Sequence, residues 1–134
     1  DFTTVGDKPE LARVQGEQGY LALAASDLPA ARGHFVRALR SNDEIGSPRG
    51  IGQVMLGLAA TEAAAGNSAR AMQIAAAAEA MSRRAGVVVE HPMAPDLANR
   101  IAALRAGIRT DDLAALTLQG EVLTPAAVLE MMAA

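Results

Sequence analysis

The feature that most constrains this sequence is an internal repeat with a period of 40 residues. When the chain is shifted by that distance, small and apolar residues fall on one another. The matching positions are Val14 on Val54, Ala24-Ala25 on Ala64-Ala65, Ala31 on Ala71 and Ala38 on Ala78. Ser26-Asp27 falls on Gly66-Asn67, which keeps a turn and the helix-capping residue that follows it. Each copy therefore predicts two helices joined by so short a link that they must be antiparallel neighbours.

Helix start signals and apolar spacing predict seven helices. Asp27 and Ser47 each stand one or two residues before a proline, and Asn67 takes the place of Asp27 in the second copy. Between these signals apolar residues recur every three or four positions, most clearly over residues 97–108. The predicted helices span residues 8–25, 28–42, 48–65, 68–85, 95–108, 111–118 and 125–132.

The composition also indicates an all-α fold. Alanine and aliphatic residues dominate, and the only aromatic residues are one tyrosine and two phenylalanines. Alanine has the highest helix propensity, and its small side chain lets helix backbones approach closely. The one β-branched run, residues 87–89, lies in a longer linker at 86–94 that contains Pro92. We expect this linker to be extended and its valines to pack over the core.

The small residues resemble those of the tetratricopeptide repeat, in which small side chains line the crossing of two helices. The residues that match its pattern are Gly19, Ala31, Phe35 and Ala38, and then Ala59, Ala71, Ala75 and Ala78. The resemblance implies a short right-handed superhelix of stacked antiparallel helix pairs, with about seven helices. Because this repeat usually takes about 34 residues, we expect the additional length of the present period to lie in the loop from Glu44 to Gly50.

The C-terminal half resembles one group within that family. The residues that carry the likeness are 56–60, 65–67, 76–80, 101–105, 119–120 and 123–128. They are similar to the C-terminal tetratricopeptide-like region of large bacterial signalling ATPases, which include LuxR-type and MalT-like transcriptional regulators and cyclase-linked proteins. The likeness implies one domain over 1–134, with repeats at 8–42 and 48–85 and C-terminal helices at 95–132, cut from a longer protein. That group usually has an aromatic residue near Thr117 and Leu118, and this chain has none there.

The sequence offers little for catalysis or metal binding. Its two histidines, His34 and His91, have no partner at metal-ligand spacing, and there are no cysteines. Neither a Walker motif nor a helix-turn-helix is present. A net charge of −3 without a dominant basic stripe argues against nucleic-acid contact, and no apolar run reaches the ~20 residues of a membrane span. We therefore expect a cytoplasmic protein that is not an enzyme and has no catalytic residues, metal or cofactor.

A protein-binding or intramolecular regulatory role in a bacterial signalling or transcriptional regulator is the expectation that remains. The candidate contact residues are Arg83, Arg84, Arg100, Arg105, Met131 and Met132. The arginines, together with Arg109, could form a basic surface for an acidic partner, or they could be solvated and paired with nearby acids. Flexible methionine side chains suit an adaptable interface. The partner would be another protein, another domain of the same chain, or a second copy. The alternative function is the sensing of a small-molecule effector in the groove of the superhelix.

Overall fold

Seven α-helices occupy residues 7–133, the part of the chain that the structure, a computed structural model, describes. They are α1 (Lys8–Ala24), α2 (Leu28–Ile45), α3 (Pro48–Ala64), α4 (Ser68–Ala85), α5 (Ala94–Ala106), α6 (Thr110–Glu121) and α7 (Pro125–Ala133). The all-α prediction is confirmed, since these residues contain no strand. Within the same residues, no helix combines the length and the apolar character that a bilayer crossing requires.

The 40-residue repeat is visible in the bounds of the first four helices. Both ends of α1 recur 40 residues later as the ends of α3, and α2 recurs in the same way as α4. The turns repeat as well, because Ser26 and Gly66 have φ of 59° and 87° in the two short connections. The backbone N–H of the next residue then bonds back to a carbonyl in the last helical turn, which closes each helix end.

The prediction of a loop from Glu44 to Gly50 is wrong. Helix α2 continues to Ile45, and α3 begins at Pro48 after only two residues. The side chain of Asn42 keeps the helix intact, because its Nδ2 donates to the carbonyl of Ala38 at 2.8 Å. Gly46, with φ of 66°, then ends the helix abruptly. The additional length of the period therefore lies in helices of 17 and 18 residues.

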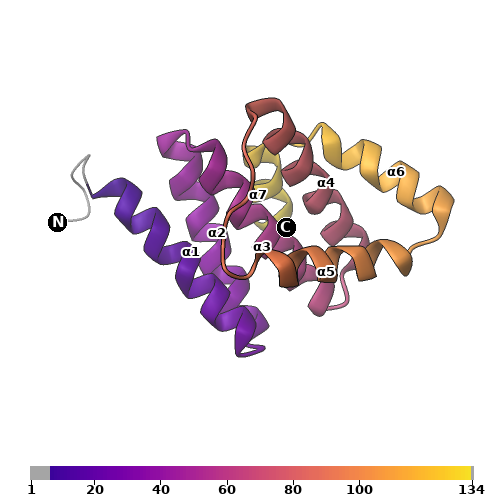
Figure 1. Cartoon of the computed structure of the whole chain (residues 1–134), viewed down its shortest axis with the longest axis horizontal. Helices are drawn as coiled ribbons and strands as arrows, with labels where there is room; N and C mark the ends of the chain where they lie inside the picture. The colour runs from indigo at the N-terminus through magenta and orange to yellow at the C-terminus, as the bar shows by residue number, and fades with distance from the viewer. Residues whose placement is uncertain (1–6, 134) are drawn as a thin grey trace.

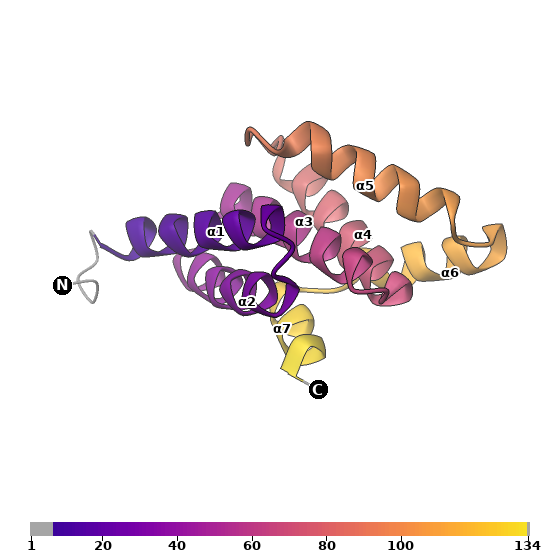
Figure 2. The ribbon, with the colours of Figure 1, turned by 90° about the horizontal axis from the view of Figure 1, so that it is seen from below.

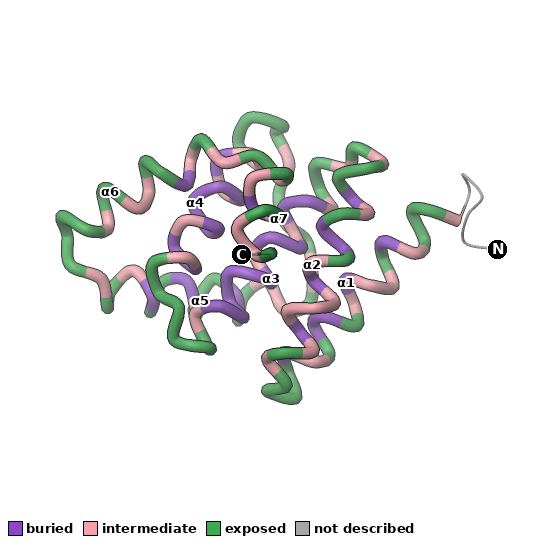
Figure 3. Tube along the Cα trace, turned by 180° about the vertical axis from the view of Figure 1, so that it is seen from behind, coloured by how far each residue is buried: buried purple, intermediate pink, exposed green. Residues whose placement is uncertain are grey.

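Consecutive helices form packed pairs, α1 with α2 and α3 with α4, and α2 packs against α3 to stack one pair on the next. This arrangement is consistent with the stacking of helical repeats. The four alanines that the repeat aligns at the helix crossings, Ala31, Ala38, Ala71 and Ala78, are all fully buried. Figure 3 shows that burial concentrates in α3 and α4, the centre of the stack. Small side chains at these crossings permit the close approach of the helix axes.

The last three helices do not form another tight pair. Helix α5 packs on α3, α6 packs on α4, and α7 packs on α2, whereas α5 and α6 make little contact with each other. Figure 1 shows α5 and α6 diverging from their connection at residues 107–109. Figure 2 shows α5 and α7 on opposite sides of the stack of α1 to α4. The divergence of α5 and α6 leaves an open space at the start of α4.

The linker between α4 and α5 is extended, as predicted, but its three valines do not all pack over the core. Val87 and Val89 are partly buried, while Val88 is 70 % exposed. An extended backbone alternates the direction of successive side chains, so only the outer two of three can face the protein.

Candidate partner-binding groove

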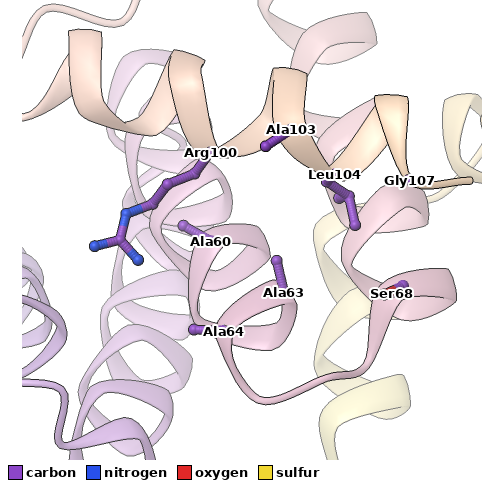
Figure 4. A pocket seen from close by; sticks show the side chains of 8 residues that line it. All are labelled: Ala60, Ala63, Ala64, Ser68, Arg100, Ala103, Leu104 and Gly107. Carbon is purple, nitrogen blue, oxygen red and sulfur yellow. The ribbon is translucent and has the colours of Figure 1, made fainter.

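The first of two adjoining cavities lies between α5 and the α3–α4 pair (Figure 4). Its volume is about 370 Å³. It is lined by Ala60, Ala63 and Ala64 of α3, Ser68 of α4, and Arg100, Ala103, Leu104 and Gly107 of α5 and its end. The lining is mostly small, because the alanine-rich end of α3 faces α5 across the gap. Arg100 is the one charged side chain in it.

The second cavity continues the first around the start of α4. Its volume is about 520 Å³. It is lined by Ser68, Ala69, Gly107, Ile108, Arg109, Asp112, Ala115, Leu116 and Gln119. Since Ser68 and Gly107 line both cavities, the two form one continuous depression, which we call the α5–α6 groove. Four helices contribute to it, and its two walls, α5 and α6, are among the most exposed helices of the chain (Figure 3).

Polar groups lie at the two ends of the groove. The Arg100 Nε donates to Asp96 Oδ2 at 2.8 Å within α5, so its charge is partly balanced by its own helix. Arg109 has no ion pair or hydrogen bond among residues 7–133 and shares its end of the groove with Asp112. Gln119 accepts a hydrogen bond from Gln73 at 2.8 Å, which ties α6 to α4. The groove therefore offers a small, mainly apolar floor with a few polar groups at its ends.

The start of α4, which forms the middle of the groove, differs from the prediction. Asp27 and Ser47 cap α2 and α3, because their side-chain oxygens accept from the N–H of Ala30 and Gly50. Asn67 was predicted to do the same for α4, and this prediction is wrong. Its Nδ2 instead donates to Glu62 Oε2 at 2.9 Å. The amide is drawn away from the helix terminus by a buried carboxylate that the first repeat lacks.

That carboxylate is the functional group that sequence reasoning missed most clearly. Glu62 is fully buried near the end of α3. Its Oε2 also accepts from Arg32 of α2 at 2.7 Å, and its Oε1 lies 3.6 Å from Arg70 Nη1 of α4. One carboxylate thus connects three helices beneath the α3–α4 turn. No local signal marks it, because position 22 of the first copy is an alanine.

The predicted contact residues lie at several places. Arg100 lines the α5–α6 groove. Arg105 bonds to Glu79 of α4 at a separate cavity of about 320 Å³ beside the first half of α5. Arg83 and Arg84 reach α6, where Arg83 Nη2 lies 4.0 Å from Glu121 Oε1 and Arg84 Nη1 donates to the Glu121 carbonyl at 3.5 Å.

Two further predicted contact residues, Met131 and Met132, are partly buried and pack from α7 against the domain's own core. Of the six predicted residues, only Arg100 therefore lines the groove.

The two histidines have different surroundings. His34 contacts Arg37 on the surface of α2, with 2.9 Å between His34 Nδ1 and Arg37 Nη2. His91, in the linker, is held against α1 by Glu17 and Tyr20. Among the described residues, no three side chains of the kinds that hold metals come together.

No family model matches this chain, and no similar curated protein or solved structure is found.

Proposed function

We propose that this domain is a protein-interaction or intramolecular regulatory module of the tetratricopeptide-like kind, and that its binding site is the α5–α6 groove. The partner is a segment of another protein or of another domain of the same chain. The likeness of the sequence to the C-terminal regions of bacterial LuxR-type and MalT-like regulators places this role in signalling or transcriptional control.

One observation carries the proposal: the groove is continuous around the start of α4 and lined mainly by small side chains. Alanines and glycine leave room for the larger side chains of a partner, and stacked helix pairs commonly hold a helix or an extended segment in such a depression. The polar groups at its ends, Arg100 and Arg109, would orient that segment.

Sensing of a small molecule is the alternative, and it has less support. The two cavities are in the size range of small-ligand sites, about 300–1,000 Å³. However, no aromatic ring lines either cavity, and hydrogen-bonding side chains are few. A thermal-shift screen with sugars, nucleotides and metal ions separates the two functions, because a true effector raises the melting temperature in proportion to its occupancy.

The direct test selects peptides of about 15 residues from a displayed random library against the whole chain, and measures their affinity for variants with a blocked groove. Ala103→Trp places an indole in the groove at an exposed position of α5. Ala126→Trp is the matched control, since it adds the same ring at an exposed position of α7, on the opposite side of the stack (Figure 2).

We expect at least one peptide class whose affinity falls about tenfold or more with Ala103→Trp, a change of about 1.4 kcal/mol, and is unchanged with Ala126→Trp. Melting curves by circular dichroism check that both variants are folded. If no peptide is selected, or if the two tryptophans have equal effects on every selected peptide, the groove is not a peptide-binding site.

A further inference from the structure

The linker between α4 and α5 is fastened to α1 by a single side chain. After α4 ends, the linker passes alongside α1 before it reaches the start of α5 (Figure 1). The imidazole of His91 stacks on the Tyr20 ring, with 4.2 Å between ring centroids and 21° between planes. Its side chain is 8 % exposed. Residues 74 positions apart are thereby joined at the point where α5 begins.

The hydrogen bonds of His91 determine its protonation state. The backbone N–H of Met93 donates to His91 Nδ1 at 3.1 Å, so Nδ1 carries no proton. Nε2 lies 2.9 Å from Glu17 Oε1, and the carboxylate can only accept. The proton of the neutral ring is therefore on Nε2, and the ring holds α1 with one nitrogen and the start of α5 with the other.

The platform beneath the imidazole is rigid. The Tyr20 hydroxyl donates to the carbonyl of Gln53 in α3 at 2.5 Å. The Tyr20 ring also meets Phe35 of α2 edge to face, with 4.9 Å between centroids. Three helices thus fix the surface on which His91 rests, and any change at the ring must be taken up by the linker.

We propose that His91 is a proton-operated catch that regulates the α5–α6 groove, an inference that rests on the proposed function of that groove. When a proton from solvent binds Nδ1, that nitrogen becomes a donor and can no longer accept from the Met93 N–H. The imidazolium keeps Nε2 on Glu17, now as an ion pair. The ring stays on α1, and the first turn of α5 loses its attachment. Since α5 supplies Arg100, Ala103 and Leu104 to the groove, one wall of the groove is loosened.

The charged groups around the ring give this direction. From α1, the Glu17 carboxylate favours the charged ring, and the Tyr20 hydroxyl is held neutral because burial raises its pKa. Glu90, the preceding residue of the linker, is exposed and has the same sign as Glu17. Gln53 and Phe35, behind Tyr20 on α3 and α2, are uncharged. Only the Met93 N–H opposes protonation, and it is the group that gives way.

The test is an NMR titration of the whole chain from about pH 8 to about pH 5, the range in which histidine side chains change charge. The backbone amide of Met93 reports the hydrogen bond to Nδ1, and the Leu97 amide, which bonds to the Met93 carbonyl, reports the first turn of α5. The chain has only two histidines. His34→Asn therefore leaves His91 as the sole imidazole, while His91→Asn retains a side-chain acceptor that does not titrate.

We expect the Met93 amide shift to follow the titration of the His91 ring in the wild type and in His34→Asn. Hydrogen-exchange protection of Met93 and Leu97, corrected for intrinsic exchange rates, should fall about 2- to 12-fold at low pH, as for the loss of one hydrogen bond. In His91→Asn both changes should vanish. In Glu17→Gln the transition should move to lower pH, because the neutral amide no longer favours the imidazolium.

Unchanged Met93 and Leu97 signals in the wild type would overturn the catch, as would a transition that persists in His91→Asn. These readouts come from the free protein and do not depend on a partner. The affinity of the selected peptides at the two pH values is measured separately. Loss of pH dependence there with an intact Met93 transition would count against the groove and leave the catch in place.

Discussion

The ring of Phe35 lies directly over the Cα of Gly19, so close that a Cβ on Gly19 would come within 2.6 Å of two ring carbons. On its other side the same ring meets Gly57, where a Cβ would come within 2.5 Å. In the second repeat, Ala59 and Ala75 stand 40 residues after Gly19 and Phe35, and both are fully buried. A glycine and a phenylalanine therefore occupy the crossing that two alanines occupy in the next pair of helices.

This contact predicts that Gly19→Ala destabilises the protein by about 1–2 kcal/mol. Alanine in a helix normally gains about 1 kcal/mol over glycine, but overpacking a filled core costs about 1–3 kcal/mol or more. The Phe35 ring cannot retreat, because Gly57 confines it from the opposite side. Urea unfolding followed by circular dichroism measures the change in the free energy of unfolding.

Gly16→Ala is the matched control for this prediction. It lies on the same helix and is also buried, but its added Cβ would meet Val54 at an ordinary contact distance of 3.8 Å. We expect Gly16→Ala to leave stability unchanged or to raise it by up to about 1 kcal/mol. Equal effects of the two substitutions would show that Phe35 does not occupy the described position.

The buried Glu62 carboxylate predicts a second effect on stability. Arg32→Ala removes one of its hydrogen bonds and leaves the charge buried beside Asn67 and Arg70. Breaking a buried ion pair costs about 3–5 kcal/mol when the remaining charge is uncompensated. Because Arg32 is itself partly exposed and two other groups still contact Glu62, we expect about 1–3 kcal/mol in urea unfolding.

Arg40→Ala controls for the loss of an arginine from the same helix. Arg40 is exposed and has no ion pair or hydrogen bond within the described part of the chain. Its removal should change stability by no more than about 0.5 kcal/mol. If Arg32→Ala is as mild as Arg40→Ala, then Glu62 does not depend on Arg32 for its burial.

Tyr20 predicts a loss of stability at alkaline pH. Burial, and secondly the charge of Glu17, raises the pKa of Tyr20 above its ordinary value of about 10. The unfolded chain therefore releases this proton at lower pH than the folded chain does. The stabilisation is complete below about pH 10 and declines as the pH rises above it, by up to about 1.4 kcal/mol per pH unit.

The measurement is unfolding at a series of pH values, with tyrosinate absorbance as a second signal. Because Tyr20 is the only tyrosine and there is no tryptophan, that absorbance reports one group. Tyr20→Phe should lose about 1 kcal/mol at neutral pH, for the bond to the Gln53 carbonyl, and should show a flatter stability profile above pH 10. A Tyr20 that ionises in the folded protein at its ordinary pH would contradict its burial.

The helix pairs were predictable from sequence because their signals are local. Asp27 and Ser47 stand next to the helices that they cap, and the small residues at the crossings recur at fixed spacing. The failures arise where a distant group competes with a local one. Asn67 has the sequence position of a cap, but Glu62 takes its amide, and Glu62 in turn is buried because Arg32, 30 residues away, reaches it.

The groove could not be predicted for a related reason. Its existence depends on the angle at which α5 and α6 leave the stack, and apolar periodicity indicates which face of a helix is buried without giving its direction. Arg100 was predicted as a contact residue from charge alone, while Ser68, Ala103 and Gly107 carry no sequence signal for binding. The attachment of His91 to Glu17 spans 74 residues and is likewise invisible to local patterns.

The wall of the groove formed by α6 gives the last prediction. Gly120 is the one buried residue of α6, and a Cβ there would come within 2.3 Å of the Gln73 carbonyl oxygen of α4. A backbone atom inside a helix cannot move aside cheaply, so Gly120→Ala must push α6 away and break the bond between Gln73 and Gln119. We expect a loss of about 2–3 kcal/mol in urea unfolding, with faster hydrogen exchange in α6 than in α1 to α3.

Gly107→Ala is the control, because Gly107 has φ of −87° and its added Cβ would meet only carbonyl oxygens at 3.6 and 3.7 Å. Any residue tolerates that backbone conformation, and we expect a change within about 0.5 kcal/mol. The comparison bears on function because α6 contributes Asp112, Ala115 and Leu116 to the groove. If α6 exchanges at the same rate in both variants, its seat on α4 is not close enough to hold that wall in place.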